Sequence, residues 1–146
     1  NNPLDLKARE KMAEASIVAG VAFSHPRTTG SHACSFPLTN IYGLPHGEAC
    51  AFTLDYFLKF NAEHADGDGR ITALAKDCGF NDAFEMADEI TAMKKRMGMR
   101  CTLSEIGCET DEQIDELTKK SMSMLMTRNP ITLTQKDIKE MYIKLK

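Results

Sequence analysis

The 146-residue chain has no tryptophan and no apolar run as long as a membrane span, which takes about 20 consecutive apolar residues. Its first residues lack the pattern of a secretory signal peptide. An excess of basic residues is also missing, since the formal net charge is −3, whereas proteins that bind nucleic acids or anionic membranes carry positive surfaces. We therefore expect a cytoplasmic protein whose partner is neither a nucleic acid nor a membrane.

A disulfide framework is not expected either. The cysteines number five, which is odd, and none forms a C-x-x-C pair, so a reducing compartment is the better interpretation. The first residue is Asn1 rather than methionine. We expect the chain to be a piece of a longer protein.

Strand patterns and internal repeats are missing as well. Apolar residues instead recur at spacings of three and four, which is typical of helices. The length suits one core, so the sequence predicts a single all-α domain over residues 1–146, a bundle of about six to eight helices. The expected helical ranges are 3–23, 31–41, 46–63, 70–78, 82–97, 102–105, 111–128 and 135–145.

Local signals place several of these helices. Thr110 with Gln113 forms a capping-box pattern, and Thr134 opens the last helix. Asn81 suits an N-cap. Residues 17–23 are almost all apolar or small, which predicts that this end of the first helix is buried on all sides.

Lys94 lies in the last turn of the helix that follows Asn81. There its charge would oppose the negative end of the helix dipole. Lys95 and Arg96 share this turn.

Two of the four histidines frame the stretch "SHACSFPLTNIYGLPHGEACAF". Pro37 is expected to kink the helix that carries His32, and Pro45 leads into a helix that begins with His46. The two segments would meet at a bend, each offering an imidazole, the commonest metal ligand. The spacing thus predicts a metal site, although catalytic metals usually need three or four protein ligands.

Alternatives compete with this hypothesis. Each histidine could be a polar helix-end residue or a core residue bonded to a carbonyl. Cys34 and Cys50 could complete a His/Cys zinc site, although free cysteines are usually small buried residues. A non-catalytic helical assembly or interaction module also stays open.

The segment "HADGDGRI" fits part of a calcium-binding loop through Asp66 and Asp68. His64 and Ala75 occupy its first and twelfth positions, where such a loop needs oxygen ligands. A polar turn is therefore the favoured interpretation.

The longer stretch "AGVAFSHPRTTGSHACSFPLTNIYGLPHGEACAFTLDYFLKFN" resembles the signature of the iron-containing (group III) alcohol dehydrogenases. The closing segments "TLSEIGCETDEQIDELTKKSM" and "RNPITLTQKDIKEMY" are similar to that family too. The resemblance implies the helical C-terminal domain of the dehydroquinate synthase-like fold. It also implies Fe(II), or Zn, bound by His32 and His46, with NAD or NADP and an alcohol or aldehyde as reactants.

The same resemblance implies what would be missing. The family's other two ligands, an aspartate and a histidine, would precede Asn1, as would its nucleotide-binding domain. We expect the chain alone to be inactive, with a homo-oligomer left open. Phe36 stands where the family commonly has a second histidine near the nicotinamide, so Phe36 is expected in the substrate or cofactor pocket. No catalytic residue is assigned.

Overall fold

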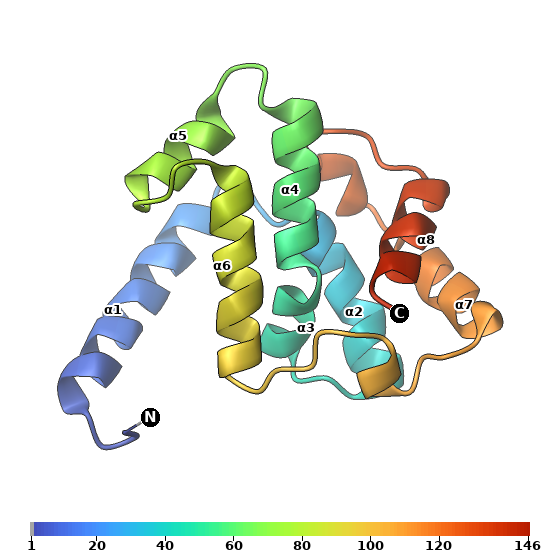
Figure 1. Cartoon of the computed structure of the whole chain (residues 1–146), viewed down its shortest axis with the longest axis horizontal. Coiled ribbons are helices and arrows are strands. Elements are labelled where there is room, and N and C mark those ends of the chain that lie inside the picture. The colour runs from blue at the N-terminus through green and yellow to red at the C-terminus, as the bar shows by residue number, and fades with distance from the viewer. Residues whose placement is uncertain (1) are drawn as a thin grey trace.

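The computed structural model describes residues 2–146, and all regular structure in that range is helical. These residues form eight α-helices, with a 3-10 turn on each side of α7 (Figure 1). Their bounds are α1 Leu6–Phe23, α2 Gly30–Tyr42, α3 His46–Phe52, α4 Leu54–Ala65, α5 Arg70–Asp77, α6 Ala83–Arg96, η1 Ser104–Ile106, α7 Asp111–Ser121, η2 Met126–Arg128 and α8 Gln135–Lys144. The predicted all-α bundle is confirmed. In the part of the chain described here, no helix has the length and apolar character to cross a bilayer.

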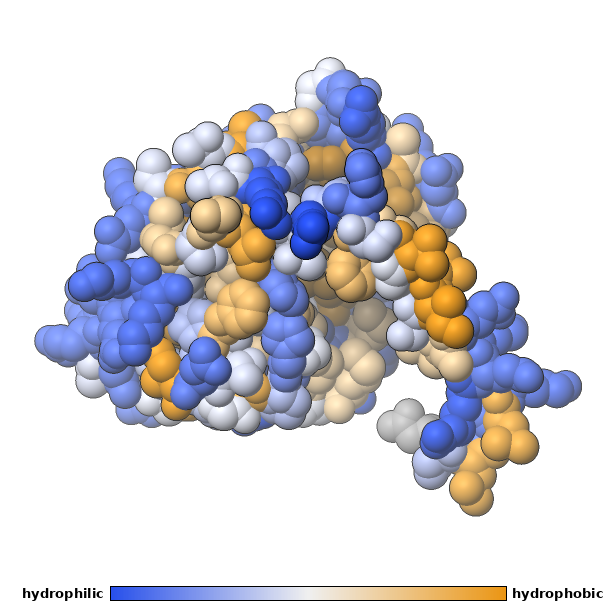
Figure 2. Space-filling model, turned by 180° about the vertical axis from the view of Figure 1, so that it is seen from behind, coloured by the Kyte–Doolittle hydropathy of each residue, from blue (hydrophilic) through white to orange (hydrophobic). Residues whose placement is uncertain are grey.

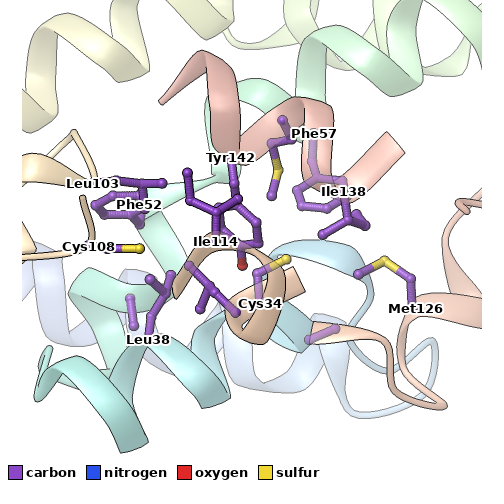
Figure 3. Close-up of a cluster of buried hydrophobic side chains, with 14 of the residues drawn as sticks. Cys34, Leu38, Phe52, Phe57, Leu103, Cys108, Ile114, Met126, Ile138 and Tyr142 are labelled. Carbon is purple, nitrogen blue, oxygen red and sulfur yellow. The ribbon is translucent and has the colours of Figure 1, made fainter. Parts of the chain in front are cut away.

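The core forms around α2, which packs against α3, α4 and α7. Figure 3 shows its side chains gathering around Tyr142 of α8. The tyrosine hydroxyl lies 2.7 Å from Ser121 Oγ, so this buried polar group has a partner. Fully buried members include Cys34, Leu38, Phe52, Leu103, Cys108, Leu117 and Met141.

Helix α1 stands apart from this core and projects to one side (Figure 1). It buries none of its residues, and Ile17 and Val21 are 69% and 71% exposed. The predicted burial of residues 17–23 is therefore wrong, because no element of residues 2–146 packs extensively on this helix. Figure 2 shows its apolar side chains on the projecting arm.

Several boundaries differ from the predicted ones. Pro3 precedes the first helix, whose N-cap is Asp5, with Oδ1 accepting from Ala8 N at 3.1 Å. The N-cap of α6 is Asp82 rather than Asn81, because its carboxylate accepts two backbone N–H bonds. The expected helix over 46–63 is broken at Thr53.

The helix that starts after Thr110 is also shorter than expected. Its predicted capping box is present, but α7 ends at Ser121, and Met122 turns to an extended ψ of 89°. The chain then makes the separate turn η2 before Asn129. Thr134 precedes the first residue of α8 as predicted, and the structure shows that it forms a capping box with Asp137.

Lys94 lies in the last turn of α6, as predicted, and it is buried there. Its side chain is 2% exposed, and Nζ donates to Asp55 Oδ1 at 2.7 Å and to the Phe52 carbonyl at 3.2 Å. That carbonyl lies at the end of α3, where the last carbonyls lack helical partners. Lys94 thus joins α6 to the α3–α4 break.

Candidate metal centre

The backbone brings two helix faces together around His32 and His46. Helix α2 begins at Gly30, where an added Cβ would lie 2.3 Å from Phe57 Cε1, so only glycine allows this close approach to α4. The helix ends at Gly43, whose φ of 70° is in the left-handed region that favours glycine. Leu44 is buried beyond this turn, and α3 begins at His46. The chain therefore reverses and lays α3 along α2.

The two imidazoles lie against each other. Their ring centroids are 4.8 Å apart and their planes make an angle of 89°. Cys50, one turn along α3 from His46, places Sγ 3.4 Å from His32 Nδ1 and 3.7 Å from His46 Nε2. One candidate ligand atom from each of these three residues lies within 4.8 Å of the others. The structure thus joins the two predicted histidines with one of the two cysteines considered.

A buried hydroxyl supports this arrangement from behind. Ser35 Oγ donates to the His32 carbonyl at 2.7 Å and lies 3.5 Å from His46 Nδ1. When His46 carries its proton on Nδ1, the hydroxyl can accept from it and Nε2 is left free to bind a cation. Ser35 is fully buried, so it contacts the His46 ring and the His32 main chain from inside the bundle.

Electrostatics favours the ligand form of His32. Burial, followed by the adjacent His46, lowers the pKa of His32 below its usual value. Both causes disfavour a positive charge on the ring. The neutral imidazole, which is the form that binds metals, is therefore favoured at neutral pH.

Glu48, also on α3, is bonded to Arg100. Its carboxylate accepts from Arg100 Nε and Nη2, both at 2.8 Å, and from the Arg100 backbone N–H at 2.9 Å. These bonds, with the side-chain contact largest, lower the pKa of Glu48 to about 2. The short helix that carries His46 and Cys50 is thereby tied to the loop after α6.

The predicted pocket residue Phe36 lies beside both imidazoles. Its ring centroid is 5.1 Å from that of His32 and 6.1 Å from that of His46. The side chain is 43% exposed and faces a shallow depression shared with Asn40 and Lys120. Phe36 therefore gives one edge of the site an apolar wall.

A second depression of about 390 Å³ opens next to His32 and Cys50. Arg27 is on its rim, with a positive φ of 69°. The composition and motif spacing gave no reason to single out this arginine. Its place in the site follows from the short segment between α1 and α2. The other lining residues are Thr28, Thr29, Ser31, Gly47, Ala51 and Leu54.

The four-ligand His/Cys hypothesis fails at Cys34. This side chain points into the core, and burial raises the pKa of its thiol to about 11. Cys50 differs, being only half-buried and facing the histidines. Cys34 is therefore the small buried residue expected of a free cysteine, whereas Cys50 is half-buried.

Asp66, one of the residues that suggested a calcium-binding loop, bonds the start of a helix instead. Asp66 accepts from the backbone N–H groups of Ile71 at 2.7 Å and Thr72 at 3.0 Å. Its carboxylate thus satisfies donors at the start of α5. The segment is a polar turn, as favoured.

Comparison with known proteins gives the family. The model of the C-terminal part of the Fe-containing alcohol dehydrogenase family matches residues 1–145. The chain belongs to the Fe-containing alcohol dehydrogenase family. An alcohol dehydrogenase of Thermococcus barophilus is 32% identical over 141 residues, covering 94% of this chain and 36% of that protein.

Two solved structures are similar over nearly the whole chain. A sulfoacetaldehyde reductase from Bifidobacterium kashiwanohense, in complex with NAD+, has a TM-score of 0.93 and 48% identity, covering 99% of this chain and 38% of that one. An iron-containing alcohol dehydrogenase from Thermococcus thioreducens has a TM-score of 0.81 and 28% identity, covering 97% and 38%. The chain thus spans little more than a third of the length of these relatives.

Proposed function

We propose that this chain is the metal-binding, C-terminal part of an NAD-linked oxidoreductase that interconverts an alcohol with an aldehyde or ketone. The observation that carries the proposal is the convergence of His32 and His46 from α2 and α3, in a chain of the Fe-containing alcohol dehydrogenase family. The donor set suits a divalent transition metal, because imidazole nitrogen binds iron and zinc well.

The chain's own residues hold and orient the reacting groups. His32 and His46 hold the cation, and Ser35 supports the His46 ring from the core. A divalent cation bound there supplies a Lewis acid that stabilises negative charge on the substrate oxygen during hydride transfer. Phe36 excludes water from one edge of the two imidazoles.

The cofactor assignment rests on relatives. The Bifidobacterium reductase was solved with NAD+, and the chain has no G-x-G-x-x-G turn of its own. We propose that NAD(P) is bound mainly by a part of the enzyme that precedes this domain.

For the substrate we propose a short aldehyde with an anionic group. The relative at 48% identity is a sulfoacetaldehyde reductase, and Arg27 lines the same depression as His32. A guanidinium pairs well with the oxygens of an oxyanion. The carbonyl end of such a substrate belongs next to the histidines, with its charged end toward Arg27.

A chimera tests the proposed function. This chain replaces the matching segment of the Bifidobacterium reductase, and NADH oxidation with sulfoacetaldehyde is followed. We expect turnover by the chimera, a loss of about a hundredfold or more in its His46→Ala variant, and little change in a His64→Ala control on α4. We expect no turnover by the 146-residue chain alone. Full activity of the His46→Ala chimera, or NADH oxidation by the chain alone, would contradict the proposal.

A further inference from the structure

We propose that the ion pair between Glu48 and Arg100 positions His46 for metal binding, so that Glu48 is a positioning residue of the site. The inference rests on the proposed function for the two histidines. It adds two residues that lie outside the candidate metal-binding group, which is His32, His46 and the adjacent Cys50. The ion pair acts through the backbone of α3, because it sets the rotation of this helix about its axis and with it the direction of the His46 imidazole.

Helix α3 has few restraints of its own. It has seven residues, its N-cap is Pro45, and no side chain caps its start. A helix this short is not stable alone in water, so contacts with other elements decide its orientation. His46 is its first residue, and helix ends fray most easily. The position of this imidazole therefore depends on what holds the first turn of α3.

Glu48 holds that first turn from a different side than His46 does. In a helix of 3.6 residues per turn, residues two apart are separated by about 200° around the axis. The His46 ring faces the His32 ring on α2, whereas Glu48 reaches the loop that follows α6. Contacts on these two sides oppose each other, so together they resist rotation of α3 about its axis.

The contact between Glu48 and Arg100 is of the strong kind. The carboxylate accepts from Arg100 Nε at one oxygen and from Nη2 at the other, both at 2.8 Å, and from the Arg100 backbone N–H at 2.9 Å. Two-point bonds between a guanidinium and a carboxylate are stronger and more directional than single ones. The Glu48 side chain is 16% exposed, so water screens this pair less than it screens an exposed surface pair.

Arg100 stands on a loop that the core holds in place. Leu103, three residues further along, is fully buried, and its backbone N–H donates to the Leu145 carbonyl at 2.7 Å. Arg100 also bonds Glu48 through its own backbone N–H, so the restraint does not depend on a long side chain alone. The core therefore holds His46 in place through this loop as well as through the buried face of α3.

The ordinary alternative is an ion pair that contributes to the stability of the fold and to nothing else. The two roles differ in what they change. A purely structural pair changes the melting temperature, and its loss leaves the metal affinity of the folded protein as it was. A positioning pair changes the metal affinity of the folded protein, as residues that orient metal ligands from outside the ligand set do.

Zinc is the probe for the test, and the protein is the chimera of this chain with the Bifidobacterium reductase. Competition with a chromophoric chelator measures the zinc affinity of Glu48→Gln, Arg100→Gln and the double variant. We expect about tenfold weaker binding in each single variant and no further loss in the double variant, because both changes remove the same contact. Circular dichroism sets a temperature at which every variant is folded.

A core variant on α8 is the matched control. Ile138 is buried in an element without extensive packing on α3, so Ile138→Val lowers the stability of the core without loosening the first turn of α3. We expect a lower melting temperature for this variant and the zinc affinity of the unmodified chimera.

The outcomes separate this inference from the proposed function. Unchanged zinc affinity in Glu48→Gln, or an equal loss in Ile138→Val, overturns the positioning role and leaves the proposed function standing. Losses that add up in the double variant overturn the claim that Glu48 and Arg100 act through their shared contact. A chimera that shows the expected zinc affinities without turnover of sulfoacetaldehyde supports the positioning role and contradicts the proposed function. Absence of zinc binding by the unmodified chimera overturns both.

Discussion

Helix α1 and the α2–α3 pair differ in burial although both are rich in apolar residues. Helix α2 buries six of its 13 residues, whereas α1, with 18 residues, buries none. Each sequence has the composition of a core helix, but only α2 has helices packed around it. Apolar composition therefore predicts the capacity for burial, and the packing partners decide whether burial occurs.

The α2–α3 pair also carries the candidate metal centre. Cys34 and Leu38 face the core from α2, and His32 and Phe36 occupy another face of the same helix. The packing that holds α2 in the core therefore also holds these candidate site residues in place. Helix α1 contributes no buried residue to the core and no residue to the candidate metal-binding group.

The largest contrast is expected from truncating one apolar side chain in each region. Leu38 is fully buried, so Leu38→Ala is expected to lower the free energy of unfolding by about 4 kcal/mol through lost burial and a residual cavity. Val18 is 62% exposed, and Val18→Ala is expected to change it by less than about 0.5 kcal/mol. Urea unfolding measures both, and equal effects would show that α1 belongs to the core.

A second contrast tests the tie between α6 and the end of α3. Lys94→Met leaves Asp55 and the Phe52 carbonyl without their buried donor, which is expected to cost about 3 kcal/mol. Lys95 is its exposed neighbour, and Lys95→Met should change stability by less than about 0.5 kcal/mol. Chemical denaturation compares the pair. A stable Lys94→Met variant would mean that this ion pair does not hold the α3–α4 break.

The third contrast compares capping carboxylates on a packed helix and on α1. Asp137 accepts from Thr134 at the start of α8, and this hydrogen bond lowers the pKa of Asp137. Asp137→Ala is expected to reduce global stability by about 1 kcal/mol, and Asp5→Ala, at the cap of α1, to leave it nearly unchanged.

The acid dependence of the Asp137 effect has a definite sign. A lowered folded-state pKa gives stabilisation that is present above the unfolded value of 3.8 and is lost as pH falls below it. The difference between wild type and Asp137→Ala should therefore shrink below about pH 4, as measured by urea unfolding across pH. A difference that grows on acidification would contradict the assigned cause.

The smallest expected effect is the free energy of local unfolding of α1. An isolated helix of this length is marginally stable in water, so its amides should exchange with solvent at close to unprotected rates. Amides near Leu38 and Tyr142 should open only with the whole domain. Hydrogen exchange followed by mass spectrometry distinguishes the two. Strong protection of α1 would indicate that it is covered, as in a self-associated form of the chain.

The local parts of the fold could be predicted from the sequence. The capping box at Thr110 and the helix start at Thr134 depend on side chains three residues away, so the sequence indicates both positions. The break at Thr53 and the burial of Lys94 depend on contacts between distant elements, and no local pattern reveals them. The exposure of α1 likewise depends on what packs against it.

The two histidines of the candidate site could be predicted from the sequence, but the contacts that bring them together could not. His32 and His46 stood out because two prolines suggested a bend between them, although convergence requires the left-handed turn at Gly43 and the close packing at Gly30. The spacing of His46 and Cys50 placed both on one helix face, but the half-exposed sulfur between two imidazoles emerges only when α3 lies along α2. Arg27 had no distinguishing local pattern.

The central claim is that His32 and His46 bind one cation together, and a zinc titration followed by histidine ring NMR tests it most directly. The chain has four histidines, of which His25 and His64 lie outside the candidate metal-binding group and serve as internal controls. The account predicts that the ring signals of His32 and His46 shift in step and saturate at one zinc per chain, while the other two stay in place. Independent shifts of His32 and His46, or equal shifts of all four, would contradict it.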